Sequence, residues 1–256
     1  MFFPILCFVG KLITGFVDNF LMINTVSGIW RRDTRYSKRF DENLALWMQT
    51  FPPFLLLRLS KSELIDYLAD AVPPFGIYSI FREEKVKGKT LLDLFAGIGG
   101  WSIGAFLYFF PQSMYVEAVE VNKGKVRVLN MIFKELKKYN EGFEYNIVNE
   151  DVRKYEPSQR FDIVTGSPPC EDYTPLNAFR GFKVYAGTDE LTREYLRVVN
   201  AVRPSYAFYE NVYAEPLVQL LRKEGFEIRK VDFSQYIPQH RERLIGVRSV
   251  SLASFI

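Results

Sequence analysis

The chain has 256 residues, of which 48% are hydrophobic and 16% aromatic, so it can bury one large core. Its net charge of +3 permits a nucleic-acid partner without requiring one. Two cysteines and a single histidine exclude a disulfide framework and a histidine-rich metal site, and they disfavour a Ser-His-Asp triad. We therefore expect no metal.

The first 40 residues stand apart by composition. They open on the apolar stretch MFFPILCFVG, which is too short to span a bilayer and lacks the basic start of a signal peptide. We therefore expect no membrane association and an intracellular protein, in the cytoplasm of its own or a host cell or at the nucleoid. The basic run from Trp30 to Arg39 is typical of a solvated loop.

A helical stretch follows this segment. Leu44, Trp47 and Met48 recur at helical spacing and predict one apolar face. Ser60 and Glu63 form a capping-box pattern at the start of a second helix. The expected helices cover residues 41–50, 64–69 and 75–81.

From residue 91 onward, short apolar runs alternate with amphipathic stretches, which is typical of a parallel sheet with crossover helices. We therefore predict an α/β fold with a mostly parallel sheet of about seven strands and helices on both faces. The predicted strands cover residues 91–95, 115–120, 143–148, 161–165, 206–209, 228–232 and 243–248. The predicted helices cover residues 100–109, 189–202 and 216–224, with a long one starting at Lys123.

The stretch TLLDLFAGIGGW, residues 90–101, reads as a strand, a glycine turn and the start of a helix. Its three glycines allow a ligand to approach the backbone, next to a helix N-terminus. Glu120 closes the next strand, where an acid can hold ribose hydroxyls. Ser102 takes the position of the third glycine of a dinucleotide fingerprint, which favours a smaller ligand without a pyrophosphate and weighs against a nicotinamide oxidoreductase.

Two further strand ends carry reactive groups. Cys170 follows Pro168 and Pro169, which would aim its thiol into the crevice, although a lone cysteine is more often a small core residue. Glu210 ends another apolar strand, and partial burial would raise its pKa enough to make it a proton donor near neutral pH.

Three donors alternate near the end of the chain. Gln239, Arg241 and Arg243 recur at period two, so on a strand they would share one face. This row is either a charged strand face or a set of donors for carbonyl or phosphate oxygens.

Together these stretches resemble the cytosine carbon-5 methyltransferases that use S-adenosylmethionine. Five short motifs occur in the order of that family, at suitable spacing. They are Asp93–Gly100 (DLFAGIGG), Glu120 with Asp151, Ser167–Cys170 (SPPC), Glu210–Val212 (ENV) and Gln239–Arg243 (QHRER). The resemblance implies a Rossmann-like methyltransferase fold.

The resemblance also implies roles for individual residues. Phe95 would flank the adenine, Glu120 would hold the ribose and Asp151 would receive the adenine amino group. Cys170 would be the nucleophile, with Glu210 and Arg241 as the other catalytic residues. The implied cofactor residues are Asp93, Phe95, Ala96, Gly97, Ile98, Gly99, Gly100, Glu120, Val121, Asp151, Val152 and Pro168. The implied target-base residues are Ser167, Pro169, Asn211, Gln239 and Arg243.

The implied function is transfer of a methyl group to carbon 5 of cytosine in DNA, as in restriction-modification systems, through a covalent Cys170 adduct on a flipped-out base. The long segment 171–187 would be the lid. Two other readings stay open: a tRNA cytosine methyltransferase, and a non-catalytic cofactor-binding or DNA-binding subunit of a split methyltransferase.

The sequence departs from the family pattern in two ways. Glu171 stands where a glutamine usually follows the cysteine, and its charge would raise the pKa of the thiol. The family's terminal helical segment, by resemblance, lies upstream as residues 46–52 and 69–74, with Asp70 in place of asparagine. We therefore expect a circularly permuted chain.

Permutation sets the expected domain division. Residues 41–256 would be the catalytic domain, and 41–86 would be its permuted helical segment, packed on the cofactor site. Residues 1–40 would be a reduced recognition or partner-docking region. So small a region predicts a very short or weakly selected target site, or a partner subunit that supplies recognition.

Overall fold

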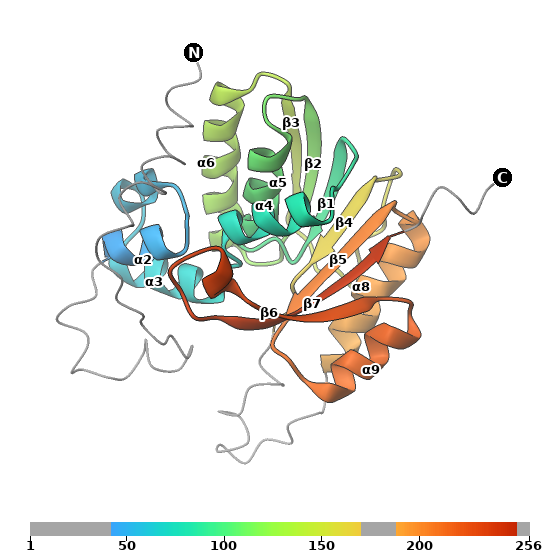
Figure 1. The fold of residues 1–256 in the computed structure, drawn as a ribbon. Coiled ribbons are helices and arrows are strands. Elements are labelled where there is room, and N and C mark those ends of the chain that lie inside the picture. The colour runs from blue at the N-terminus through green and yellow to red at the C-terminus, as the bar shows by residue number, and fades with distance from the viewer. Residues whose placement is uncertain (1–41, 170–187, 250–256) are drawn as a thin grey trace.

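The computed structural model describes residues 42–169 and 188–249 (Figure 1). The predictions for Cys170, for the lid segment 171–187 and for residues 1–40 therefore concern residues outside the described part of the chain. In that part, none of the helices has the length and apolarity needed to cross a membrane.

A seven-stranded sheet forms the centre of the molecule, in the order β3-β2-β1-β4-β5-β7-β6. Strands β1 to β5 are parallel, whereas β7 runs antiparallel to both β5 and β6. The mostly parallel sheet predicted from the alternating pattern is thus confirmed. The strands are β1 (Thr90–Leu94), β2 (Met114–Val119), β3 (Phe143–Val148), β4 (Ile163–Gly166), β5 (Tyr206–Asn211), β6 (Glu227–Asp232) and β7 (Glu242–Ser249).

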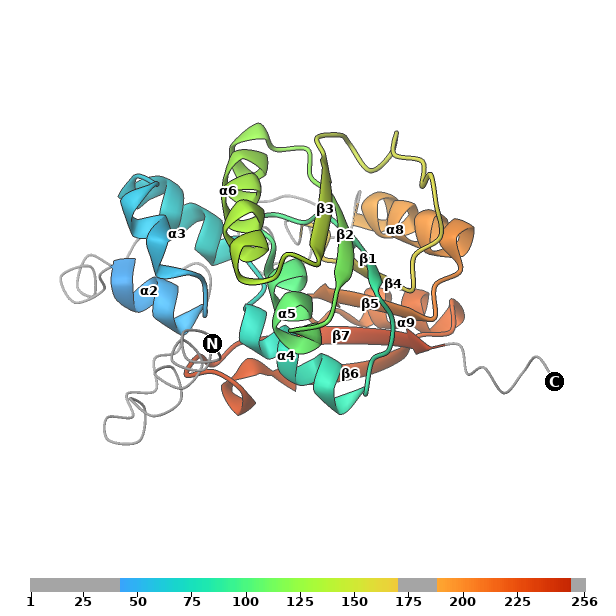
Figure 2. The same cartoon turned by 90° about the horizontal axis from the view of Figure 1, so that it is seen from above.

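Helices cover both faces of the sheet (Figures 1 and 2). Alternate strand residues point to opposite sides, so that Leu91 belongs to one hydrophobic cluster and Leu92 to the other. One cluster takes in α4, α5 and α6, and the other takes in α8 and α9. These helices are α4 (Pro74–Glu83), α5 (Gly100–Phe109), α6 (Lys123–Tyr139), α8 (Thr188–Val202) and α9 (Glu215–Lys223).

The described chain begins with α2 (Glu42–Met48), the 3-10 turn η1 (Pro53–Leu57) and α3 (Lys61–Asp70). The predicted capping box is present, because Ser60 Oγ accepts from the Glu63 backbone N–H while the Glu63 carboxylate accepts from the Ser60 N–H. Of the apolar face predicted for α2, Met48 is buried and Trp47 is half-buried, and Ala45 and Leu46 are buried beside them.

The segment before β1 packs directly on α5. A Cβ atom on Gly100 would lie 2.1 Å from the Val72 carbonyl oxygen, and one on Gly104 would lie 2.5 Å from the Ile77 Cβ. The Phe81 ring continues this contact, with its centroid 6.0 Å from that of Trp101. Gly100 and Gly104 therefore let the upstream segment approach the α5 backbone closely.

Candidate cofactor and target-base site

The glycine turn after β1 leaves its backbone open on one side. Gly97 and Gly99 have φ angles of +58° and +90°, in the left-handed region that glycine tolerates best, and Phe95 shares this region at +57°. A Cβ on Gly97 would meet no atom closer than the Phe95 carbonyl oxygen at 4.0 Å. A ligand can therefore approach the turn at Gly97.

Glu120, directly after β2, faces this turn. Its side chain is buried, and its Oε2 accepts from the Gly97 N–H at 2.8 Å while Oε1 accepts from the Asn122 N–H at 2.7 Å. Because β1 and β2 are adjacent and parallel, the glycine turn and the acid meet at one sheet edge. The next residue, Val121, is 63% exposed.

Asp151 lies in the loop that follows β3, the next strand of the sheet. The Arg153 guanidinium and backbone N–H both donate to its carboxylate, and these hydrogen bonds lower the pKa of Asp151 to about 2. Asn149 Nδ2 donates to the Glu120 carbonyl at 2.8 Å, which ties the loops after β2 and β3 together. The glycine turn, Glu120 and Asp151 thus follow three neighbouring strands.

Asp93 supports the turn from inside the core. Its side chain is fully buried and accepts from Ser102 Oγ at 2.6 Å and from Thr165 Oγ1 at 3.0 Å. The carboxylate of Asp93, one of the expected cofactor residues, thus holds β1, α5 and β4 together beneath the turn. Ser102, noted in the sequence as a missing glycine, supplies one of these bonds.

Burial raises the pKa of Asp93 to about 7. In the unfolded chain the pKa of this carboxyl group is near 3.8, so the folded state binds the proton more tightly than the unfolded state. The protonated group therefore stabilises the fold below pH 3.8, and this contribution is lost progressively as the pH rises to about 7. The loss amounts to about 4 kcal/mol.

An Asp93→Asn variant keeps an acceptor for Ser102 and cannot ionise. We expect the free energy of unfolding of the wild type, relative to this variant, to fall between pH 4.5 and 7 in urea titrations; a difference independent of pH would contradict this.

The ends of β4 and β5 form the second half of the site. Ser167 Oγ accepts from Trp101 Nε1 at 2.8 Å, and the Pro168 carbonyl accepts from Asn211 Nδ2 at 3.1 Å. Pro169, the last residue described before Cys170, is exposed. The sequence had not marked Trp101 for the site, although it directly follows the glycine turn.

Glu210 is buried at the end of β5 and forms an ion pair with Arg243 of β7, with Nε 3.2 Å from Oε1. Gln239 and Arg241, which alternate with Arg243 in the sequence, do not lie on this strand, because β7 begins only at Glu242. The prediction of a period-two row on one strand face was therefore wrong.

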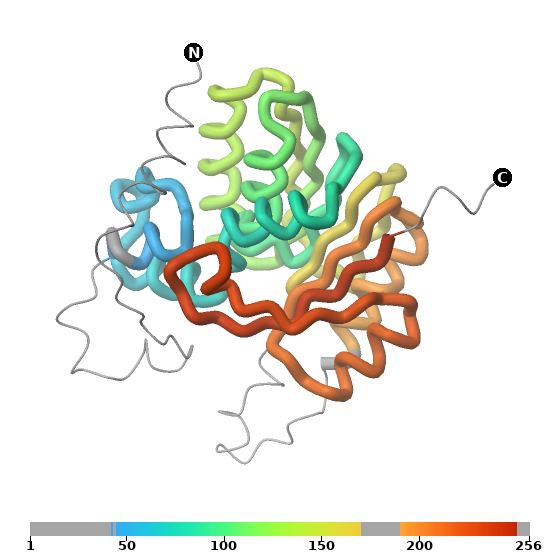
Figure 3. The backbone as a smooth tube through the Cα atoms, in the orientation of Figure 1, coloured from blue at the N-terminus to red at the C-terminus, as the bar shows by residue number. Residues whose placement is uncertain are grey.

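The reason is the turn between β6 and β7, which Figure 3 traces. The 3-10 turn η2 (Phe233–Gln235) follows β6, and the Phe233 N–H donates to the Arg241 carbonyl. Gln239 and Arg241 are nevertheless buried. The Arg241 guanidinium donates to the Ala69 carbonyl at 3.4 Å, so this turn contacts the segment upstream of β1.

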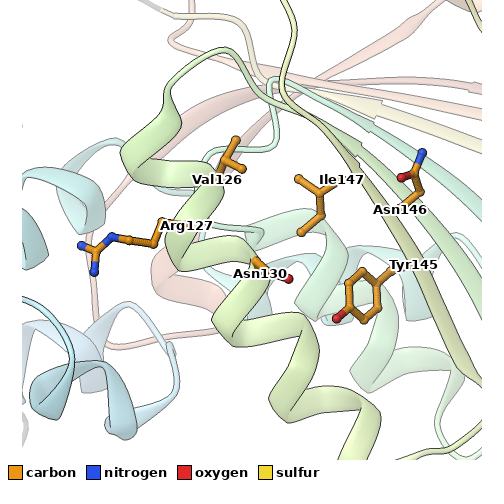
Figure 4. Close-up of a pocket in the computed structure, with 6 residues that line it drawn as sticks. All are labelled: Val126, Arg127, Asn130, Tyr145, Asn146 and Ile147. Atoms are coloured by element: carbon orange, nitrogen blue, oxygen red, sulfur yellow. The ribbon is translucent and has the colours of Figure 1, made fainter.

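A groove of about 340 Å³ lies apart from these strand ends, between α6 and the edge strand β3 (Figure 4). It includes none of the expected site residues. Its lining consists of Val126, Arg127, Asn130, Tyr145, Asn146 and Ile147. In the described part of the chain, no group of three or more His, Cys, Asp or Glu side chains is placed to hold a metal ion.

The strand order with an antiparallel β7 and the ligand-accessible turn after β1 define a Rossmann-like methyltransferase fold. Residues 89–248 match the model of the C-5 cytosine-specific DNA methylase family. The match covers more than half of the chain, and the protein belongs to this family. C-5 cytosine methylases use S-adenosylmethionine, the cofactor expected from the sequence.

Type II methyltransferases are among the relatives. M.PspPI of Psychrobacter sp. is 25% identical over 185 residues, which cover 65% of this chain and 41% of that protein. M.HgiDI of Herpetosiphon aurantiacus is 26% identical over 184 residues, covering 64% and 54%. M1.ScrFI of Lactococcus lactis subsp. cremoris is 25% identical over 203 residues, covering 72% and 48%. The matched part of this chain thus spans about half the length of these relatives.

Proposed function

We propose that this chain transfers a methyl group from S-adenosylmethionine to carbon 5 of cytosine in DNA. The observation that carries the proposal is a juxtaposition at one sheet edge. The open glycine turn with Glu120 and Asp151 lies at the ends of β1 to β3, and buried Glu210 with Pro169 lies at the ends of β5 and β4. Cys170, the next residue after Pro169, is the nucleophile in this proposal.

The residues at the first three strand ends fit the cofactor. Gly97 has the space for backbone approach, and the carboxylates of Glu120 and Asp151 accept hydrogen bonds of the kind that ribose hydroxyls and an adenine amino group donate. By the family resemblance, the ring of Phe95 would flank the adenine. When bound, the cofactor supplies an electrophilic methyl group on its sulfonium.

The residues at the second half fit the base. Carbon 5 of cytosine is a poor nucleophile until the Cys170 thiolate adds to carbon 6, which makes carbon 5 able to attack the methyl group. A protonated Glu210, placed at ring nitrogen 3 and the amino group, would offset the negative charge that develops on the ring, and Arg241 would contact the ring carbonyl. Loss of the carbon-5 proton then expels Cys170. Such a pocket requires the base to leave the duplex.

The upstream helices support the proposal of a permuted catalytic domain over residues 41–256. The contacts of Val72 with Gly100 and of Arg241 with Ala69 bring the segment 41–86 to the cofactor turn and to the target-base residues. Asp70 occupies the position where the family has asparagine, and its Oδ2 lies 3.6 Å from Lys125 Nζ. We propose that residues 1–40 or a partner subunit contribute to target recognition.

Incubation of the purified chain with radiolabelled S-adenosylmethionine tests the function. We expect label in cytosine-containing DNA and none in DNA whose cytosines already carry a 5-methyl group. Bisulfite sequencing of the product would locate the modified positions and measure how short the target site is. Label in tRNA alone would favour the RNA substrate, and label in neither would favour a non-catalytic subunit.

A further inference from the structure

A buried carboxylate lies in the middle of β2 and has no part in the mechanism above. Glu117 is only 4% exposed, on the sheet face that α8 covers. Tyr115 Oη and Asn146 Nδ2 donate to its Oε2, each at 3.0 Å, and Tyr155 Oη donates to its Oε1. Burial of a carboxylate is costly unless hydrogen bonds replace its water, so these donors keep Glu117 in place.

Tyr155 connects this carboxylate to the loop that carries Asp151. Its side chain is 3% exposed, and its backbone N–H donates to the carbonyls of Asp151 and Val152, each at 3.2 Å. Burial, followed by the bond to Glu117, raises the pKa of Tyr155, so its hydroxyl stays a donor. Backbone hydrogen bonds therefore close the turn from Asp151 to Tyr155, and the Tyr155 side chain attaches this turn to Glu117 of β2.

Helix α8 holds the same turn from the other side. The Arg197 guanidinium donates through Nη2 to the carbonyls of Val152 at 3.0 Å and Tyr155 at 2.8 Å. Its Nε pairs with Glu194 one turn earlier on the helix, at 2.7 Å. Arg153, by contrast, orients the Asp151 carboxylate from within the turn. The position of the turn is set by Tyr155 and Arg197.

We propose that Glu117 and Tyr155 are positioning residues for S-adenosylmethionine, acting through Asp151. Tyr155, anchored on the buried Glu117, holds the turn so that Asp151 meets the adenine amino group. The inference rests on the proposed function, since it takes Asp151 as the residue that reads the adenine. When the turn is already ordered, cofactor binding costs less conformational entropy.

The test is a double-mutant cycle in cofactor binding by the full chain. Calorimetry with S-adenosylhomocysteine would compare the wild type with Tyr155→Phe, Asp151→Ala and the double variant. Tyr155→Phe removes one hydroxyl, and we expect it to weaken binding about fivefold to tenfold. In the Asp151→Ala background the same change should have no further effect, because the residue through which Tyr155 acts is gone.

Tyr115→Phe is the matched control, because it removes the other tyrosine hydroxyl from the same carboxylate without touching the turn. It should leave the affinity for S-adenosylhomocysteine unchanged.

A second readout uses S-inosylhomocysteine, in which an oxygen replaces the adenine amino group. The wild type should bind S-adenosylhomocysteine more tightly than this analogue, and the difference should be smaller in Tyr155→Phe.

Three results would overturn the inference while the function stands: wild-type affinity in Tyr155→Phe, an undiminished effect in the Asp151→Ala background, or equal weakening by Tyr115→Phe. Absence of cofactor binding by the intact chain would instead refute the proposed function, and the role of Asp151 with it.

Discussion

Replacing Cys170 with alanine is expected to reduce methyl transfer by more than about a thousandfold, because no other group would activate carbon 5. The Pro168 carbonyl, two residues before Cys170, accepts from Asn211 Nδ2 of β5, and the neighbouring Glu210 on that strand is buried. An alanine keeps the chain at this point and removes only the thiol. Cofactor affinity, which depends on the ends of β1 to β3, should stay within about twofold of the wild type.

A trapping experiment measures the same prediction directly. DNA with 5-fluorocytosine at the target cannot lose its carbon-5 substituent, so the adduct should survive a denaturing gel. The chain offers a matched control, since Cys7 is the one other cysteine in the sequence. Cys7→Ala should keep the shifted band and Cys170→Ala should lose it. A band that persists in Cys170→Ala would assign the nucleophile elsewhere.

The sequence predicted the fold well because local patterns and the fold agree. The predicted strand 143–148 and helix 100–109 match β3 (Phe143–Val148) and α5 (Gly100–Phe109) residue for residue. The segment of β3 alternates apolar with polar residues, and that of α5 is almost wholly apolar, and a glycine precedes each, so pattern and length leave little choice. Parallel pairing follows from the crossover helices, and it brings the glycine turn and Glu120 together.

What the sequence did not reveal are contacts between distant residues. The bond from Tyr155 to Glu117 spans 38 positions, and nothing local to either residue marks it. The bond from Thr165 to Asp93 likewise joins residues that are 72 positions apart. Alternation suggested a shared strand face for Arg241 and Arg243 as one of two readings, whereas Arg241 precedes β7 in a turn that is bonded to Phe233.

A chain reduced to residues 87–256 is expected to lose its stable fold and its cofactor binding. The removed segment buries large apolar side chains, and each contributes about 1.5–3 kcal/mol to stability. Among those that are fully or almost fully buried are Leu46, Phe51, Leu55, Leu64, Leu68, Ile77 and Phe81. Their sum of about 10–21 kcal/mol is as large as, or larger than, the net stability of about 5–15 kcal/mol that is typical of a domain.

The deletion would also expose the partners of this segment on α5 and the sheet. The Phe81 ring packs on Trp101 and on Phe208 of β5, with centroids 6.0 Å and 4.9 Å apart. Val72 lies against Gly100, the first residue of α5 and part of the glycine turn. The glycine turn would lose its contact with Val72, so we expect the deletion to weaken cofactor binding as well as the fold.

The matched control is a chain that lacks only residues 1–40, which retains every described helix. We expect it to show cooperative thermal unfolding and to bind S-adenosylhomocysteine like the full chain. The 87–256 chain should show neither, by circular dichroism and calorimetry. If it instead stayed folded and bound the cofactor normally, residues 41–86 would be an accessory to the catalytic domain, and the proposal of a permuted segment would be wrong.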